Sequence, residues 1–366
     1  LLADVDDRMC RVDAAPYREA ARLDPKEVMV RLALGLALRR NGELESSIGQ
    51  YREAVRLDPS NAAGHFALGN VFSDIGDLEG AIAAFREAVR LDPDHAISHS
   101  NLGIVLSNSG DLDGAIAAYR QALRLNPNRA GIHYSLGNAL GRKGDRQGAI
   151  AAYREALRLD PNHVSAHVNL GVALRRTGDL DAAVAEHRAA LRLDPTRANS
   201  HNSLGLISKD RGDLDGAIEE YRMALRVAPR HVAARFNLGL ALRDKGDLDD
   251  ALKELREVLR IDPDHPFAYY QLGLLLKGRG DLDGAIREYR EQLRVDPEHV
   301  RTHYALGLAL KESGDLDGAI GEFREALRVD PNYVRAHYAL GHALEDSGDL
   351  DGAIRGYTGA LRLDRN

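Results

Sequence analysis

The chain has 366 residues, of which 44% are hydrophobic and 29% charged, a balance typical of globular proteins that excludes disordered and membrane-embedded classes. Its 49 basic and 56 acidic residues give a net charge of −7, without the basic excess of nucleic-acid-binding proteins, so we expect no nucleic-acid partner. One cysteine, Cys10, excludes an intramolecular disulfide, and no apolar run approaches the roughly 18 residues of a membrane span, so we expect no membrane insertion and a cytoplasmic location.

Residues 1–15 do not follow the pattern of the remaining chain. Leu1, Val5, Met9 and Val12 keep a helical stripe, and Pro16 is placed to open a helix that runs to Leu23. Terminal units of repeat proteins usually diverge from the internal ones. We therefore interpret 1–27 as a degenerate N-terminal half-repeat that caps the fold.

From residue 28 onward the sequence repeats every 34 residues without insertion or deletion. Asp-Pro or a close variant ends each unit, and we number positions so that this proline is position 32 and Val28 is position 1. Such a period indicates a solenoid of stacked supersecondary units. The ten predicted repeats are 28–61, 62–95, 96–129, 130–163, 164–197, 198–231, 232–265, 266–299, 300–333 and 334–366.

Each repeat predicts two helices. The second, for example Asp111 to Leu125, has apolar residues at helical spacing, an acidic start and a proline just beyond its end. The first contains Leu-Gly at positions 7 and 8, and a later glycine such as Gly110 is predicted to adopt the left-handed conformation after the helix. The residue after the proline, for example Asp94 or Asn162, is predicted to cap the next first helix.

Leu-Gly at 7 and 8, Ala at 20, Tyr or Phe at 24, Ala at 27 and Pro at 32 resemble the tetratricopeptide repeat family from about Pro16 to Asn366. The resemblance implies an all-α fold, an α-solenoid wound as a right-handed superhelix of ten tandem helix–turn–helix repeats plus the half-repeat, with the first helices lining a concave groove. It favours a protein–protein interaction scaffold that binds an extended peptide or partner protein in that groove, without catalytic activity or a cofactor. Two alternatives stay open: a substrate-recognition arm of a larger enzyme such as a glycosyltransferase, and a self-associating structural solenoid.

Position 6 carries a row of short polar side chains. At one-repeat spacing they could bond the backbone of an extended peptide. The row resembles the asparagine ladder in the repeat arm of protein O-GlcNAc transferases; the alternative is that each side chain bonds a neighbouring turn. These predicted peptide-binding residues are Asn101, Ser135, Asn169, Ser203, Asn237 and Gln271.

The C-terminal half adds aromatic and cationic side chains to the predicted site. Aromatic rings beside cations suit an acidic or aromatic-bearing segment, so an acidic partner is expected there. The alternative is that the tyrosines fill space between repeats. The predicted residues are Tyr270, Tyr304 and Tyr338 at position 5, and Arg243, Lys277 and Lys311 at position 12, with further charge from Arg301 and Arg335 at position 2.

Two other patterns suggest metal sites and are rejected. Seven histidines share position 4, but helices pack about 8–10 Å apart, too far for equivalent side chains to share one zinc ion. The recurrent Asp-Leu-Asp-Gly lacks the spacing of a calcium loop, and helix capping explains it. We therefore predict no metal site.

The final helix keeps the apolar stripe of internal repeats, including Leu350, Ile354 and Leu361. We expect one side of this stripe to be exposed. An exposed apolar patch usually marks a contact surface. It therefore favours homo-association through the C-terminal repeat.

Overall fold

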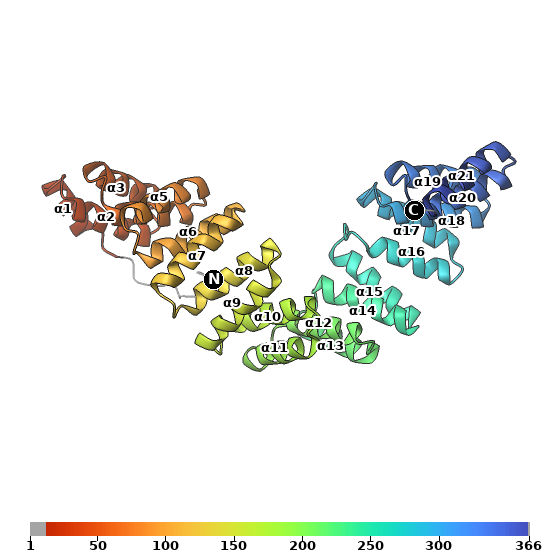
Figure 1. Ribbon diagram of the computed structural model, residues 1–366, viewed down its shortest axis with the longest axis horizontal. Helices are drawn as coiled ribbons and strands as arrows, with labels where there is room; N and C mark the ends of the chain where they lie inside the picture. The colour runs from red at the N-terminus through yellow and green to blue at the C-terminus, as the bar shows by residue number, and fades with distance from the viewer. Residues whose placement is uncertain (1–11, 365–366) are drawn as a thin grey trace. The chain divides into compact units, whose positions relative to one another are not determined.

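The computed structural model describes residues 12–364, which form 21 α-helices and, within that range, no β-strand (Figure 1). The predicted all-α class, a solenoid of tandem helical repeats, is confirmed. The chain divides into two compact units, Leu1–Leu193 (unit 1) and Asp194–Asn366 (unit 2). Cys10, Leu1, Val5 and Met9 lie outside the described residues.

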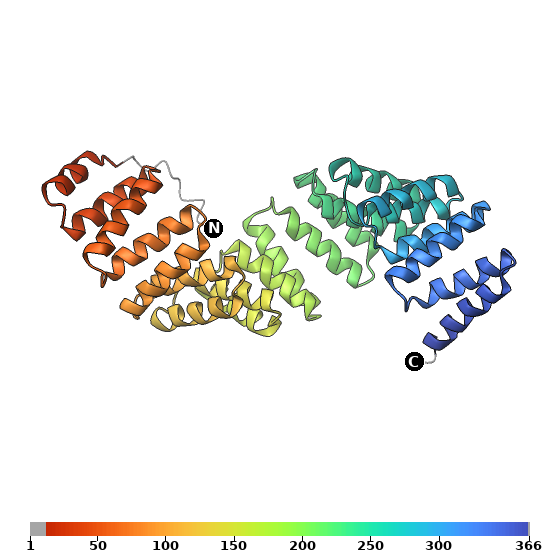
Figure 2. The same ribbon diagram turned by 90° about the horizontal axis from the view of Figure 1, so that it is seen from above.

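Unit 1 consists of α1 (Ala15–Leu23) followed by five helix pairs, which Figure 2 shows stacked in chain order from red to yellow-green. Within the unit, each helix from α1 to α10 packs against the next one along the chain. The pairs are α2 (Val28–Arg40) and α3 (Leu44–Leu57), α4 (Ala62–Asp74) and α5 (Leu78–Leu91), α6 (Ala96–Ser109) and α7 (Leu112–Leu125), α8 (Ala130–Lys143) and α9 (Arg146–Leu159), and α10 (Val164–Arg176) and α11 (Leu180–Leu193).

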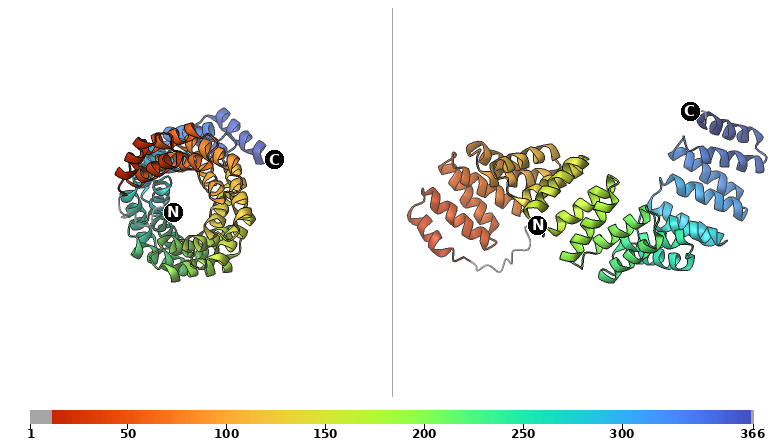
Figure 3. Two further views of the ribbon diagram at one scale, coloured as in Figure 1. Left: turned by 90° about the vertical axis from the view of Figure 1, so that its left-hand side faces the viewer. Right: turned by 60° about the horizontal axis from the view of Figure 1, so that its bottom comes forward.

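Unit 2 consists of five further pairs, and the right-hand view of Figure 3 shows its cyan and blue helices as successive hairpins. One continuous cluster of buried side chains extends from Ala217 to Ala353. The pairs are α12 (Ala198–Asp210) and α13 (Leu214–Val227), α14 (Val232–Lys245) and α15 (Leu248–Ile261), α16 (Ala268–Gly278) and α17 (Leu282–Val295), α18 (Val300–Ser313) and α19 (Leu316–Val329), and α20 (Val334–Asp346) and α21 (Leu350–Asp364).

The turn between the two helices of a repeat follows from its sequence. Gly110 ends α6 with φ at 92°, and the equivalent glycine of every repeat has φ between 78° and 95°, which confirms the predicted left-handed residue. Asp111 then caps α7, because its side chain accepts a hydrogen bond from the Gly114 amide at 2.9 Å.

The turn between repeats differs from the prediction in one respect. Asp94 and Asn162 were expected to cap the following helices, and that is wrong: the N-caps of α6 and α10 are His95 and His163. Pro161 and Asn162 form the turn itself, in which the Asn162 amide donates to the Asp160 side chain at 3.1 Å. The cap therefore moves one residue along the chain, and His163 Nδ1 accepts from the Ala166 amide at 3.2 Å.

Glycine at position 8 and an aromatic ring at position 24 recur together in most repeats because the two residues are in close contact. A Cβ atom on Gly103 would lie 2.6 Å from Tyr119 Cε1, so only glycine allows the second helix to approach the first. Tyr221, Tyr289 and Phe323 at the same position are fully buried. In eight of the ten repeats a Tyr or Phe ring is thus seated on the glycine of its own first helix, and His187 and Leu255 take this place in the other two.

Helix α21 exposes the stripe predicted from the sequence. Leu350 and Ile354 are each 63% exposed and Leu361 is 60% exposed, whereas Ala353 and Ala360 on the same helix are buried. The exposure agrees with the expectation.

Candidate recognition surfaces on the first helices

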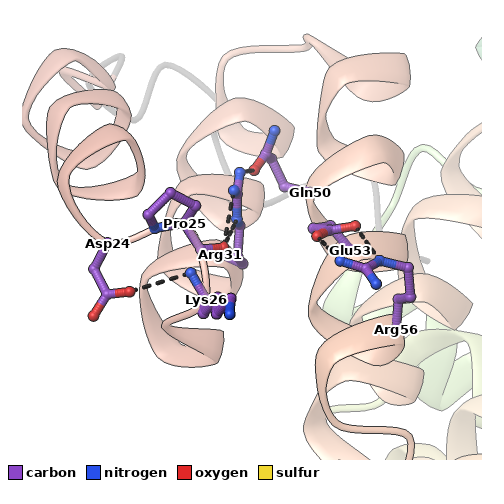
Figure 4. A network of polar contacts seen from close by, with 7 residues as sticks. All are labelled: Asp24, Pro25, Lys26, Arg31, Gln50, Glu53 and Arg56. Atoms are coloured by element: carbon purple, nitrogen blue, oxygen red, sulfur yellow. Dashed lines mark hydrogen bonds and ion pairs between the residues drawn. The ribbon is translucent and has the colours of Figure 1, made fainter.

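In most repeats the residue at position 4 ties the first helix to the turn that precedes it. His99 Nε2 donates to the Pro93 carbonyl at 2.9 Å. In the first repeat Arg31 takes this role, donating to the Pro25 carbonyl at 3.0 and 3.2 Å and to Gln50 at 2.8 Å (Figure 4). The same bond to the preceding proline is made by His65, His133, His167, His303 and His337.

Three of the position 4 histidines contact a carboxylate of their own repeat. His167 Nδ1 lies 2.6 Å from Oε2 of Glu186. The corresponding distance is 2.7 Å for the pairs His201–Glu220 and His303–Glu322. Burial opposes a charge on His303, but Glu322 and the Pro297 carbonyl together raise its pKa above the ordinary value. Among residues 12–364 no group of three or more His, Cys, Asp or Glu side chains is placed to hold a metal ion.

The position 6 asparagines link successive first helices. Asn101 Nδ2 donates to Asn70 Oδ1 at 2.9 Å, and Asn237 Nδ2 donates to Asn202 Oδ1 at 3.0 Å. Asn169 Nδ2 donates to Asn138 Oδ1 at 2.8 Å and lies 3.3 Å from the Tyr134 hydroxyl. These bonds go to the preceding repeat's first helix and not to a turn, which neither earlier interpretation anticipated.

The other position 6 residues are also half-buried. Ser135 bonds the Tyr119 hydroxyl, and Gln271 accepts a hydrogen bond from the guanidinium of Arg243. Ser203 lies half-buried on α12. Sequence reasoning missed Asn70 and Asn138 as ladder partners, although both stand at position 9 of the repeat before the asparagine that they bond.

A large hollow, the unit 1 hollow, opens on α6, α8 and α10 and encloses about 1240 Å³. Ser135 and Asn169 line it, together with Asn138 and Tyr134, which the sequence had not singled out. Asn101 is not among its lining residues. Tyr119 and Tyr153 form part of its floor, and burial raises the pKa of each to about 12, so both hydroxyls are neutral donors at physiological pH.

A smaller hollow, the unit 2 hollow, encloses about 490 Å³ over α16 and α18. It brings together the predicted Tyr270, Tyr304 and Lys277 with Arg301 and Arg335, and adds Tyr333, which the sequence had not indicated. Burial raises the pKa of Tyr270 and Tyr304. Arg243, Tyr338 and Lys311 are not part of its lining.

The position 12 cations are paired within the protein. Lys277 forms an ion pair with Glu312, and Lys311 Nζ lies 2.6 Å from Asp346. Arg243 pairs with Asp244 at 2.6 Å. In the described part of the chain, by contrast, no carboxylate lies within 4.0 Å of the guanidinium groups of Arg301 and Arg335.

Tyr338 belongs to a separate aromatic group at the C-terminal end of unit 2. Its side chain is 56% exposed, and its ring lies 4.7 Å from that of His342 and 5.7 Å from that of Tyr357. The structure therefore does not place Tyr338 with Tyr270 and Tyr304.

The position 12 pairs follow a rule that runs through both units. A cation at position 12 contacts an acidic side chain at position 13 of the following repeat, on the edge of the first-helix surface. The pairs are Arg39–Asp74, Lys209–Asp244, Lys277–Glu312 and Lys311–Asp346. Each of these four pairs links two neighbouring repeats.

Comparison with protein families assigns the fold to a class. The family described as "Tetratricopeptide repeat" matches residues 66–130, 134–198 and 203–266, and a second match with that description covers 334–366. The description "TPR repeat" matches 35–76, 276–314 and 308–348. The chain belongs to the tetratricopeptide repeat family, a class of helical scaffolds for protein interactions.

Solved structures give more distant similarities. The match to YrrB, described as a TPR protein with an unusual peptide-binding site, has 24% identity and a TM-score of 0.47, covering 50% of this chain and 95% of that one. The match to MamA has 28% identity and a TM-score of 0.43, covering 44% and 95%. Yeast Tom70 has 15% identity and a TM-score of 0.46, covering 93% and 92%. A search of curated proteins found no match.

A transmembrane helix requires length and apolar character together. Among the described helices, none is long and apolar enough to cross a membrane.

Proposed function

We propose that this chain is a protein-interaction scaffold that binds an extended segment of a partner protein in the unit 1 hollow. The observation that supports the proposal most is the chemistry of the lining. It combines amides and hydroxyls, apolar side chains and arginines, and contains no Asp or Glu. The proposal assigns the chain no catalytic role. The repeat boundaries and the cytoplasmic location, which were expected from the sequence, stay predictions.

The hollow offers what an extended segment needs. Peptide N–H and C=O groups require acceptors and donors, which Ser135, Asn138 and Asn169 supply in its centre. Ile97 and Val172, 46% and 37% exposed, offer apolar surface for side chains of the segment. A mixed lining of this kind is typical of peptide-recognition grooves.

Blocking the hollow tests the proposal. Val172→Tyr inserts a large ring into the hollow and removes no hydrogen bond, so we expect affinity for a bound peptide to fall at least tenfold, about 1.4 kcal/mol. Leu36→Tyr is the matched control, because Leu36 is 42% exposed at the same repeat position of α2 and lies outside the hollow. Peptides selected from a random array with the full chain would be titrated against both variants by fluorescence anisotropy. Equal affinities would contradict the proposal.

The row of position 6 asparagines has its own test, which compares one variant in unit 1 with the equivalent variant in unit 2. Asn169→Ala and Asn237→Ala each remove a side-chain bond to an Asn on the preceding first helix, and each should lower stability by about 0.5–1.5 kcal/mol. Only Asn169 lines the unit 1 hollow, so only its replacement should also weaken peptide binding, by about 2- to 12-fold. Equal stability losses without any affinity difference would assign the ladder a purely structural role.

The unit 2 hollow supports a second binding surface, for acidic or aromatic segments of the partner. Arg301 and Arg335 carry charges that the fold leaves unpaired, beside Tyr270, Tyr304 and Tyr333. Cations next to aromatic rings favour carboxylate-bearing and aromatic ligands. The proposed acidic ligand therefore depends on these two arginines more than on Lys277 and Lys311.

The charge of this second surface predicts salt dependence. Binding of a Glu- and Tyr-rich peptide to the full chain should weaken clearly between 0.05 and 0.5 M NaCl, because exposed charges are screened over about 8 Å at physiological salt. Arg301→Gln with Arg335→Gln should flatten this dependence. Lys277→Gln with Lys311→Gln removes the same charge from paired side chains and should largely retain it. A salt profile that is flat for the unmodified chain would refute the proposed acidic preference.

Two other functions remain as alternatives. A self-associating solenoid is favoured by one observation, the exposed Leu350, Ile354 and Leu361 of α21, and sedimentation of an Ile354→Glu variant would test it. The role of a substrate-recognition arm in a larger enzyme rests on the resemblance of the ladder to that of O-GlcNAc transferases.

A further inference from the structure

The unit 1 hollow has a strongly basic end. Arg142 near the end of α8, Arg146 at the start of α9 and Arg176 at the end of α10 all line it. Arg142 is held in place, because one of its nitrogens donates to the carbonyl of Ser107 at 2.8 Å and to the Ser107 hydroxyl at 2.9 Å. The lining of the hollow therefore includes three positive side chains, from the end of α8, the start of α9 and the end of α10.

These arginines lack counter-charges. Within residues 12–364 no carboxylate oxygen lies within 4.0 Å of the guanidinium groups of Arg142, Arg146 or Arg176, and the lining contains no acidic residue. Leaving three neighbouring cations without an anion costs free energy through mutual repulsion. Apart from the bonds of Arg142 to Ser107, the described part of the chain gives these three side chains no polar partner, so a bound anion is the simplest reason for the arrangement.

The arrangement also reverses the charge that position 13 carries in four other repeats. Arg142 and Arg176 stand at position 13, where Asp74, Asp244, Glu312 and Asp346 pair with the preceding repeat's cation. For Arg142, the preceding position 12 carries Ser107 instead of a cation. At Arg142 and Arg176, which both line the hollow, position 13 thus carries a positive charge instead of the acid of an inter-repeat ion pair; Arg40 of the first repeat, outside the hollow, is the other cation at this position.

We infer that this basic end binds a phosphoryl group carried by the bound protein segment, an inference that rests on the proposed peptide-binding function. A phosphorylated side chain brings close to two negative charges and three acceptor oxygens, which suit three guanidinium groups. A carboxylate brings one charge and two oxygens, and leaves more of the positive charge unbalanced. The net charge of −7 argues against a polyanion such as nucleic acid, which needs an extended basic surface.

The rest of the segment has a defined path. From Arg142 to Arg129, at the other end of α8, the hollow extends over 13 residues of helix, or about 20 Å. That length accommodates about six residues of extended chain. The segment would pass Asn138 and Ser135, which lie between the two arginines on α8.

The test compares one set of array peptides synthesised in three forms, with serine, phosphoserine or glutamate at the same place, and incubated with the full chain. We expect phosphoserine peptides to bind at least tenfold more strongly than serine peptides, with glutamate between them. Arg142→Gln, Arg146→Gln and Arg176→Gln together should remove that preference. The matched control replaces Arg120, Arg154 and Arg188, three exposed arginines of α7, α9 and α11 outside the hollow, by Gln, and should retain it.

The inference would be overturned if the three peptide forms bound equally. It would also be overturned if the preference for phosphoserine persisted in the variant with Arg142, Arg146 and Arg176 replaced by Gln, which we call the hollow variant. If serine peptides bind and Val172→Tyr abolishes their binding, the proposed function stands even then. If no peptide binds, the ³¹P linewidth of inorganic phosphate tests the anion site. Broadening by the unmodified chain and by the control variant, but not by the hollow variant, would support the site. No broadening by the unmodified chain would refute it. Arg176→Gln alone, which breaks no hydrogen bond of the described structure, replaces the triple variant if that fails to fold.

Discussion

Gly307→Ala is expected to lower the free energy of unfolding by about 1–3 kcal/mol, the usual cost of overpacking a core. Alanine is by itself the better helix former by about 1 kcal/mol. In α18, however, a Cβ atom on residue 307 would lie 2.6 Å from Cε1 and 2.8 Å from Cδ1 of Phe323. The Phe323 ring is fully buried in the core. The steric cost therefore exceeds the gain in helix propensity.

A second glycine in the same repeat provides the control. Gly321 lies on the exposed face of α19, and no atom lies within 4 Å of a Cβ placed there. Gly321→Ala should therefore stabilise the protein by about 0.5–1 kcal/mol. Urea unfolding of both variants measures the difference. A neutral Gly307→Ala would show that the ring and the first helix are not in the close contact described.

Acid should destabilise unit 1 through His187. This ring replaces the Tyr or Phe of other repeats at position 24 and is completely buried against Gly171. Burial, with a smaller contribution from the charge of Arg175, lowers its pKa to about 4. The unfolded chain takes up a proton near pH 6.5, while the folded chain resists it until about pH 4. Stability is therefore lost as pH falls from about 6.5, by about 3 kcal/mol once pH 4 is reached.

The variant His187→Phe isolates this effect. Phe85 and Phe323 occupy the equivalent position of other repeats, so the ring fits against the glycine of the first helix. Near pH 7 the difference in unfolding free energy between the two proteins should hardly change with pH. Between pH 6.5 and 4.5 the Phe variant should become steadily more stable than the unmodified chain. Thermal unfolding at pH 7.0, 5.5 and 4.5 measures it. A constant difference across this range would show that His187 does not resist protonation.

Local sequence signals determined most of the fold. The 34-residue period, Asp111 as a helix start and Gly110 as a left-handed residue all lie within a few residues of the structure that they specify. The pairing of Gly103 with Tyr119 is already present in the spacing of positions 8 and 24. The prediction that Asn162 caps α10 was wrong. Asn162 belongs to the turn after the proline, and the sequence alone does not show that this turn ends one residue before the cap, His163.

The recognition surface could be predicted only in part, because its contacts join different repeats. The sequence indicated Asn169 and Tyr270, but not that Asn169 would bond Asn138 across a repeat boundary. It also did not show that Lys277 and Lys311 would pair with acids of the next repeat and leave Arg301 as an unpaired cation. Such pairings depend on the stagger between neighbouring first helices, which no single repeat specifies.

Photocrosslinking of a bound peptide tests the central claim most directly. Benzoylphenylalanine placed at Val172, in the unit 1 hollow, should crosslink an array-selected peptide in the full chain. The same group at Arg154, exposed on the second helix α9 and outside the hollow, should not. Efficient crosslinking at residue 172 with little at 154, suppressed by unlabelled peptide, is the predicted result. Crosslinking at 154 that equals or exceeds that at 172 would contradict binding in the unit 1 hollow.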